Sequence, residues 1–361
     1  MKHTTTRRTV LKTTLLGSAA AVSPWLRAQA PSSTPTAVAA PAAASAPAQA
    51  IAKIPKLLLA GPSASVSNAL IRIVDAGLLA DVAEQVEFLP WKDPDQLRAM
   101  AVEGKADFMA MPSNVAANLF NRGVALQLLN ISIWGLLFVV SRDPAIKTLA
   151  DLKGKELVMP FRGDMPDIVL RTVAAKLGVP IGEGADAITL RYTATPLEAM
   201  QLLLTRRADH ALLAEPAVSV GLLKSRSLPA SVIAPALHRS VDVQQAWGQA
   251  FARAPRIPQA GMVAMGKHLG NAALQARFAQ AYAQAQQWCN TQPDACGQAV
   301  AKRLPMLTPE GVAAAIRAVP GQVVPAQQAR AELEFFFEQL RASQPGLIGG
   351  KLPAEGFYGG V

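Results

Sequence analysis

The chain has 361 residues, of which 51% are hydrophobic and 17% are charged. This apolar fraction excludes a disordered protein, and the length indicates two domains rather than one. Two cysteines exclude a scaffold built from disulfides, and the absence of any run of 18 apolar residues excludes an ordinary transmembrane helix.

The first thirty residues have the features of an export signal. The pair Arg7-Arg8 is followed by Lys12, an uncharged stretch over 13–26 and the small residues Ala28-Gln29-Ala30. This order predicts a signal peptide over 1–30, and fourteen uncharged residues are too few to span a bilayer. The paired arginines resemble a twin-arginine (Tat) signal, with a Sec signal as the alternative. Either route predicts export to the periplasm.

The basic excess of the chain is concentrated in this same segment. The formal net charge is +10, and residues 1–30 hold five basic residues and no acidic one. Half of the excess therefore leaves with the signal, and we predict no nucleic-acid partner. Residues 31–53 follow as a linker, because nine alanines and four prolines within 31–50 cannot form a core.

The body of the chain alternates between strand and helix patterns from residue 54 onward. Short apolar runs predict strands over 56–60, 86–89, 107–111, 126–133, 136–140, 157–159, 188–192, 211–214 and 261–265. Helical patterns follow most of them, and helices also fit 267–288, 293–303, 308–318 and 326–342. The alternation predicts an α/β fold with parallel sheets. The glycine-rich end, 346–361, is expected to be a loose tail.

Candidate ligand residues stand where predicted strands end, because a parallel sheet binds ligands beyond the carboxyl ends of its strands. The candidates at these ends, most of them polar or charged and several at helix starts that favour an anion, are Ser63, Ser65, Ser113, Asn114, Arg162, Gly163, Asp164 and Glu215. Each also has a structural interpretation. The serines and Asp164 can cap helices, Arg162 can form a salt bridge, and Glu215 can cap a helix, bridge two lobes or accept a ligand amine.

Motifs for catalysis and metal binding are missing from the sequence. The four histidines lie far from one another and from the cysteines, so we expect no metal site. We find no nucleophile elbow, Walker loop or dinucleotide fingerprint, and we therefore expect no enzyme and no cofactor. Cys289 and Cys296 are candidates for a local disulfide in an oxidising compartment, with free thiols as the alternative.

Several stretches resemble the periplasmic solute-binding proteins of ABC transporters, specifically the nitrate/sulfonate/taurine class. They include Lys105-Ala106-Asp107, Arg207-Ala208-Asp209 and the run from Leu149 to Lys155, Leu-Ala-Asp-Leu-Lys-Gly-Lys. The resemblance implies a type II periplasmic-binding-protein fold with two lobes joined by a two-segment hinge. Lobe 1 would comprise 54–140 and 260–361, and lobe 2 would comprise 141–259.

The same resemblance implies a function and adds Trp134, which also fits a core position, to the ligand loops. The chain would capture a small organic anion (a sulfonate, taurine, nitrate or a carboxylate) as a monomer and deliver it to an ABC permease in the inner membrane. Departures from the family at Gly61-Pro62-Ser63-Ala64-Ser65 and at Ala214-Glu215-Pro216 leave the solute open. A binding module for a membrane sensor and a same-fold enzyme of precursor biosynthesis are the alternatives.

Overall fold

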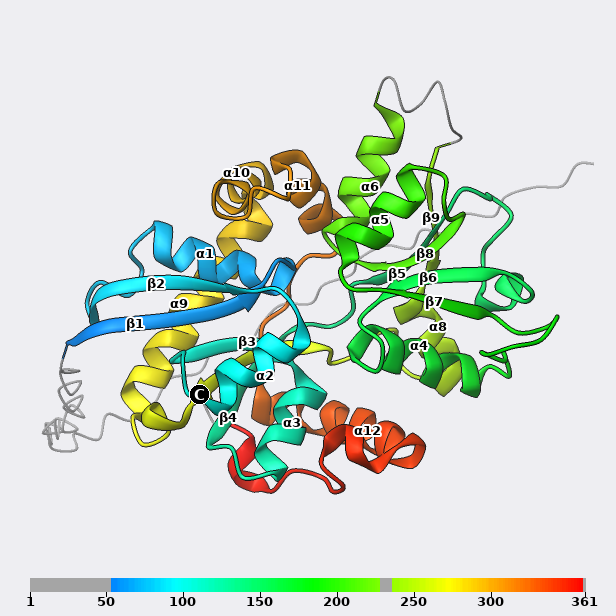
Figure 1. Cartoon of the computed structure of the whole chain (residues 1–361). Coiled ribbons are helices and arrows are strands. Elements are labelled where there is room, and N and C mark those ends of the chain that lie inside the picture. The colour runs from blue at the N-terminus through cyan, green and yellow to red at the C-terminus, as the bar shows by residue number, and fades with distance from the viewer. Residues whose placement is uncertain (1–52, 228–235, 360–361) are drawn as a thin grey trace, which may run out of the picture. The chain divides into compact units, whose positions relative to one another are not determined.

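The computed structural model describes residues 53–227 and 236–359, which belong to one compact unit. The predicted signal peptide and almost all of the predicted linker lie outside the described residues. Two β-sheets, each flanked by helices, organise this unit (Figure 1). We call the first sheet and its helices lobe 1, and the second sheet and its helices lobe 2.

Lobe 1 contains a six-stranded sheet in the order β11-β4-β10-β3-β1-β2. Its strands are β1 (Ile54–Pro62), β2 (Ala83–Trp91), β3 (Phe108–Pro112), β4 (Leu126–Ile133), β10 (Ala260–Met265) and β11 (Val324–Pro325). Its helices are α1 (Asn68–Asp75), α2 (Pro94–Val102), α3 (Ser113–Asn121), α9 (Ala272–Thr291), α10 (Pro293–Arg303), α11 (Pro309–Ala318) and α12 (Ala326–Ser343).

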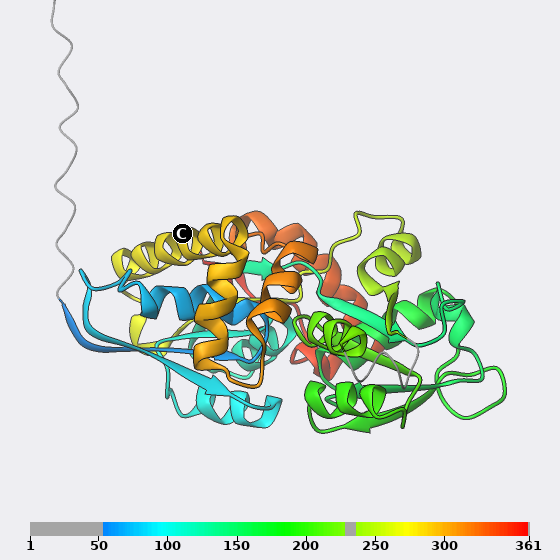
Figure 2. The same ribbon diagram turned by 90° about the horizontal axis from the view of Figure 1, so that it is seen from above.

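Lobe 2 contains a five-stranded sheet in the order β7-β6-β8-β5-β9. Its strands are β5 (Leu137–Ser141), β6 (Glu156–Pro160), β7 (Thr189–Thr193), β8 (His210–Ala214) and β9 (His238–Asp242). Its helices are α4 (Met165–Lys176), α5 (Pro196–Leu204), α6 (Ala217–Arg226) and α8 (Val243–Phe251). Figure 2 shows these elements, in green, beside the blue and orange helices of lobe 1.

Both sheets are mixed, so the expectation of purely parallel sheets is wrong. Strands β1, β2 and β3 are parallel to one another, but β10 is antiparallel to β3 and to β4. In lobe 2, β5 is antiparallel to β8 and β9. The cause is the chain path: β5 and β10 each begin where the chain has just crossed from the other lobe. They therefore start at the edge where the parallel strands end, and run in the opposite direction.

The chain crosses between the lobes twice, and the two crossings lie side by side. The first covers 134–136 and the second 252–259. Backbone hydrogen bonds join them, from Ile257 N to Trp134 O at 2.8 Å and from Gln259 N to Ile133 O at 3.0 Å. The first crossing precedes the boundary expected at 140, because β5 belongs to the second sheet. A short two-segment hinge results.

The C-terminal residues pack on lobe 1 rather than forming a loose tail. Ile348, Phe357 and Tyr358 are buried, and Tyr358 forms a bridge with Leu128 of β4. The aromatic and aliphatic side chains of this segment hold it on lobe 1, because their burial removes apolar surface from water. The prediction of a loose tail considered only the glycines. Cys289 and Cys296 are also buried and form a disulfide between α9 and α10. Within the described ranges, no helix combines the length and apolar character needed to cross a membrane.

Candidate ligand-binding cleft

A cavity of about 160 Å³ lies where the carboxyl ends of strands from both sheets meet. Lobe 1 and the second crossing contribute Pro62, Ser63, Ala64, Val66, Trp91, Lys92, Pro94, Leu97, Met111, Pro112, Val115, Gln259 and Ala260. Lobe 2 and the first crossing contribute Leu136, Leu137, Phe161, Asp164, Met165, Pro166, Pro196 and Ala214. The two lobes and the hinge therefore wall one site.

Strand register explains how distant residues meet on the lobe 1 wall. Because β1 and β2 are parallel, Pro62 at the end of β1 lies beside Trp91 at the end of β2. The Trp91 indole donates a hydrogen bond to Ala110 O at 3.3 Å, which fixes the ring over β3. Lys92 follows Trp91 and is exposed at the cavity edge.

The lobe 2 wall is built in the same way around β6, β7 and β8. Leu137 pairs with Ala214 across the antiparallel β5–β8 ladder, and both line the cavity. Phe161 follows β6 directly, and Pro196 begins α5 just after β7. Parallel pairing of Pro160 with Thr193 aligns these two strand ends.

The cavity wall is mainly apolar, with few groups that can form hydrogen bonds. Five of the lining residues are prolines, which have no backbone N–H to donate. The polar side chains on the wall belong to Ser63, Lys92, Asp164 and Gln259. The start of α3 also faces the cavity through Pro112 and Val115, and a helix start presents unsatisfied N–H groups and a partial positive charge.

Ser113 and Gln259 hold the hinge beneath this site. The Ser113 hydroxyl donates to Pro258 O at 2.6 Å, and Ser113 N donates to Gln259 O at 2.9 Å. The Gln259 side chain accepts from Leu136 N at 2.9 Å, which ties one crossing to the other. Ser113 therefore anchors the second crossing to α3 instead of lining the cavity.

Of the residues selected from the sequence, Ser63 and Asp164 line the cavity. Asn114 is buried beside Ser113. Trp134 lies at the hinge, where its indole donates to Gln322 O and Arg256 stacks on its ring at 3.6 Å.

Glu215 is buried in lobe 2, where it accepts from Ser219 N at 3.0 Å and pairs with Arg239. Burial raises the pKa of Glu215. Of the interpretations made from the sequence, helix capping agrees with these contacts, because Glu215 accepts from a backbone N–H in the first turn of α6.

Arg162 and Gly163 lie outside the cavity, and so does Ser65. Arg162 is exposed and lies 5.4 Å from the centre of the Tyr192 ring. The reason is the loop conformation: Phe161 and Gly163 both have positive φ, +62° and +75°, and the turned loop brings Phe161 to the cavity instead. The expected ligand role of Arg162 has no support in this arrangement.

The sequence reasoning missed several residues that build the wall, notably Trp91, Lys92, Phe161 and Pro196. Three of them follow from the rule about strand ends, because they stand at the ends of the strands predicted over 86–89, 157–159 and 188–192. Lys92 adjoins the first of these ends. Gln259 had no such signal, since its role depends on the second crossing. No group of three or more His, Cys, Asp or Glu suited to a metal ion occurs in the part of the chain that the structure describes.

Comparison with known proteins identifies the fold. No protein-family model matches the sequence, and no curated protein matches it. An ABC transporter structure from Parabacteroides distasonis is 20% identical, with a TM-score of 0.67 over 84% of this chain and 98% of that one. The alkanesulfonate-binding protein SsuA from Xanthomonas axonopodis pv. citri, bound to MOPS, is 17% identical, with a TM-score of 0.63 over 84% and 98%. The fold is that of an ABC-transporter solute-binding protein.

A third neighbour of this solute-binding fold is the periplasmic nitrate-binding protein NrtA from Synechocystis PCC 6803. It is 15% identical, with a TM-score of 0.60 over 82% of this chain and 85% of that one. SsuA and NrtA are both named as binding proteins. The predicted type II fold with two lobes is confirmed. In such a fold a ligand that touches both lobes favours their closed arrangement.

Proposed function

We propose that the chain is the solute-binding component of an ABC importer, exported to the periplasm, where it acts as a monomer and delivers its solute to a membrane permease. The observation that carries this proposal is a cavity walled by both lobes and by the hinge. A solute in that cavity contacts both lobes at once, so its binding energy favours closure. The permease then distinguishes loaded from empty protein by shape, without any covalent step.

The solute that fits best is a small organic acid with a compact apolar body. An engineered cavity of about 150 Å³ holds benzene, so about 160 Å³ suits a body of one ring or a short branched chain. The apolar wall stabilises that body by removing its surface from water. The start of α3 and the Lys92 ammonium supply positive potential for an acid group. In this proposal these two groups supply the positive charge that the sequence-based hypothesis assigned to Arg162.

Among the solutes bound by neighbouring structures, organic sulfonates agree better with this wall than nitrate does. SsuA binds alkanesulfonates and NrtA binds nitrate, as their names state. A bare inorganic anion would lose its water in an apolar cavity with few donors, which is costly. An organic sulfonate or carboxylate can keep its charged end near Lys92 while its body fills the cavity. Taurine fits less well. Among the described residues, the one carboxylate on the wall that could pair with its ammonium, Asp164, is already paired with Arg98.

The test is a binding panel with one variant that fills the cavity. Calorimetry should detect binding of benzoate or benzenesulfonate and no heat with nitrate. Ala64→Trp, on the cavity wall, should abolish that binding, whereas Ala80→Trp, at an exposed turn of lobe 1, should leave it unchanged. Binding that persists in Ala64→Trp would reject this cavity as the solute site. Turnover of any panel compound would reject the importer proposal in favour of an enzyme.

A further inference from the structure

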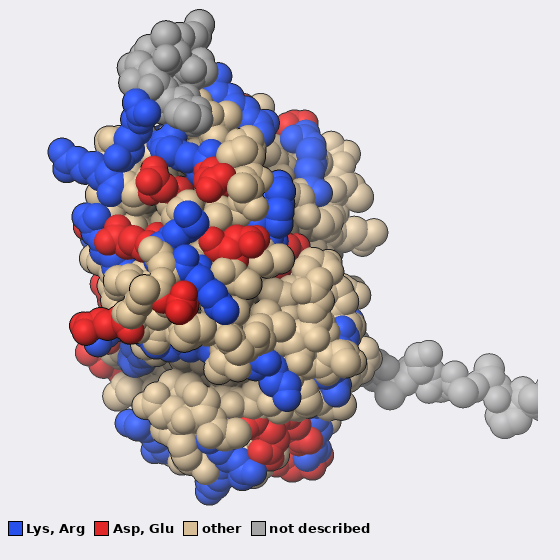
Figure 3. All heavy atoms as spheres, turned by 90° about the vertical axis from the view of Figure 1, so that its right-hand side faces the viewer, with Lys and Arg blue, Asp and Glu red and all other residues tan. Residues whose placement is uncertain are grey.

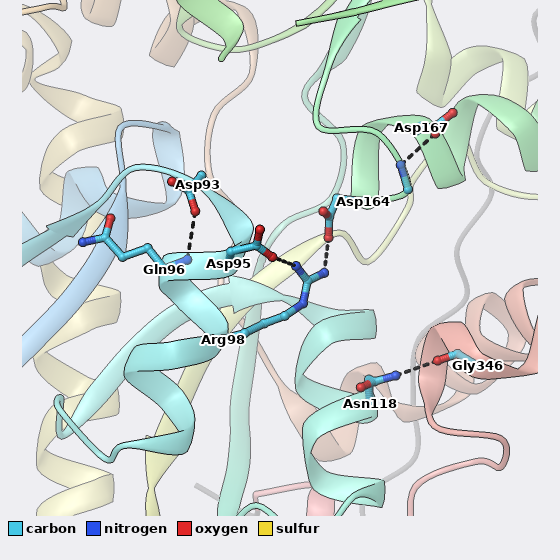
Figure 4. Close-up of polar contacts among 9 residues, drawn as sticks. Asp93, Asp95, Gln96, Arg98, Asn118, Asp164, Asp167 and Gly346 are labelled. Carbon is cyan, nitrogen blue, oxygen red and sulfur yellow. Dashed lines mark hydrogen bonds and ion pairs between the residues drawn. The ribbon is translucent and has the colours of Figure 1, made fainter. Parts of the chain in front are cut away.

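An ion pair between Arg98 and Asp164, of which only Asp164 lines the cavity, joins the two lobes. Arg98 of α2, in lobe 1, pairs through Nη2 with Oδ1 of Asp164, which precedes α4 in lobe 2 (Figure 4). The second guanidinium nitrogen of Arg98 lies 3.3 Å from Asp95, one turn earlier on α2. Of the described residues that line the cavity, Asp164 is the only acidic one.

Asp164 gives up a local hydrogen bond to make this contact. It occupies the N-cap position of α4 with the extended backbone that a capping residue needs, yet its side chain caps nothing. Asp93 before α2 and Asp242 before α8 do cap their helices, each accepting from backbone N–H groups at 2.8 Å. The carboxylate of Asp164 is therefore directed at the other lobe rather than at its own helix (Figure 4).

The position of this carboxylate makes its charge important for the solute. The Asp164 side chain is only 15% exposed, whereas the Arg98 side chain is 40% exposed. Burial raises the pKa of Asp164, and Arg98 opposes that shift. A carboxylate on an apolar wall repels anions and attracts cations strongly, because little water screens it. Arg98 opposes this field without itself lining the cavity.

We propose that Arg98 is a specificity-determining residue: by pairing with Asp164 across the lobes, it prevents cationic solutes from using that carboxylate and permits acids to enter. This inference deepens the proposed function, on which it rests. It explains why a cavity for an acid can tolerate an aspartate on its wall. It also makes the identity of the solute depend on a residue that need not touch it.

The experiment compares two ligands with the same ring and opposite charge, benzoate and benzylammonium, by calorimetry at neutral pH. Arg98→Met should bind benzylammonium at least about tenfold more tightly than the unaltered protein does, and benzoate at least about tenfold more weakly. The double variant Arg98→Met/Asp164→Asn should lose the gain for benzylammonium. Arg277→Met removes an arginine–aspartate pair within lobe 1, with Asp81, and should change neither affinity.

Two outcomes would overturn the inference. One is that Arg98→Met gains no affinity for benzylammonium. The other is that both ligands weaken by the same factor, which would mean that the pair only holds the lobes together. Arg98→Gln, which retains polarity at this half-exposed site, serves if the methionine variant does not fold. A failure of the proposed function is distinguishable from these outcomes, because the unaltered protein would then not bind benzoate at all.

Discussion

Asp107 shows how a single carboxylate can organise the sheet of lobe 1. It is fully buried immediately before β3 and accepts hydrogen bonds from Leu58 N at 2.6 Å and from His268 Nε2 at 2.8 Å. Lys267 Nζ lies 2.5 Å from the same carboxylate. Burial alone would raise the pKa of Asp107, but the hydrogen bonds from His268 and Lys267 lower it below its usual value. The carboxylate thus links β1, β3 and the turn after β10.

Replacing this carboxylate should change how stability depends on pH. A lowered pKa in the folded state means that Asp107 stabilises the fold above its unfolded pKa of about 4, and that this contribution is lost as pH falls through the lower folded value. Asp107→Asn should reduce the free energy of unfolding by about 1–3 kcal/mol at neutral pH. Below pH about 4 its deficit relative to the unaltered protein should shrink.

Urea unfolding followed by circular dichroism across this pH range measures the effect. Asp186→Asn, at an exposed position before β7, is the matched control and should have little effect. A deficit that is the same at every pH would show that Asp107 contributes through its shape and not through its charge.

Individual site residues were only partly predictable. Ser63 and Asp164 follow from the rule that ligands bind beyond strand ends, and the same rule applied to the strand that ends at Trp91 would have found that residue. The direction of the Arg162 side chain could not be predicted, because it is set by the positive φ of Phe161 and Gly163. A phenylalanine in the sequence does not indicate that backbone conformation. Glu215 and Ser113 look polar and available in the sequence, but both are consumed by hydrogen bonds within the fold.

At the scale of elements, the hydrophobic pattern predicted most strands and the four C-terminal helices, but it missed α6, β9 and α8. Strand β9 reads His-Arg-Ser-Val-Asp and lies at a sheet edge, so it carries no apolar run. Helix α8 is fixed by Trp247, whose ring packs against Phe335 and Phe336 of α12. Such long-range packing leaves no local signature. Strand direction was also hidden, since it follows from where the chain crosses between lobes.

The hinge provides a prediction about a single glycine. Gly135, in the first crossing, has a φ of +137°, and a Cβ there would lie 1.8 Å from Cγ of Gln244. The Gln244 side chain accepts from Leu137 N at 3.1 Å, so displacing it also breaks a hydrogen bond at the start of β5. Gly135→Ala should therefore lower the free energy of unfolding by about 2 kcal/mol or more.

Gly270→Ala is the control for this prediction, because a Cβ at Gly270 meets nothing within 4 Å and its φ is not positive. Chemical denaturation should show it within about 0.5 kcal/mol of the unaltered protein. Equal stability of the two variants would mean that the first crossing tolerates a side chain at position 135, and that Gln244 does not pack tightly against it.

At the scale of the whole molecule, two lobes share a hinge and touch through helices on either side of it. Helix α12 of lobe 1 packs on α8 of lobe 2, and Gly311 of α11 lies against Val220 of α6. On the face of lobe 2 shown in Figure 3, Lys and Arg are interspersed with Asp and Glu, so this face carries both signs of charge. The two-lobed architecture was predictable through resemblance, whereas its mixed sheets and the position of the first crossing required the structure.

Small-angle X-ray scattering with and without the bound solute tests the central claim most directly. Once the binding panel has supplied a ligand, the radius of gyration should fall as the ligand saturates the protein, because a solute that contacts both lobes favours their closed arrangement. Ala64→Trp, with the cavity filled, should show no change on addition of the same compound. Scattering curves that stay identical while calorimetry records full occupancy would contradict closure of the lobes around the solute.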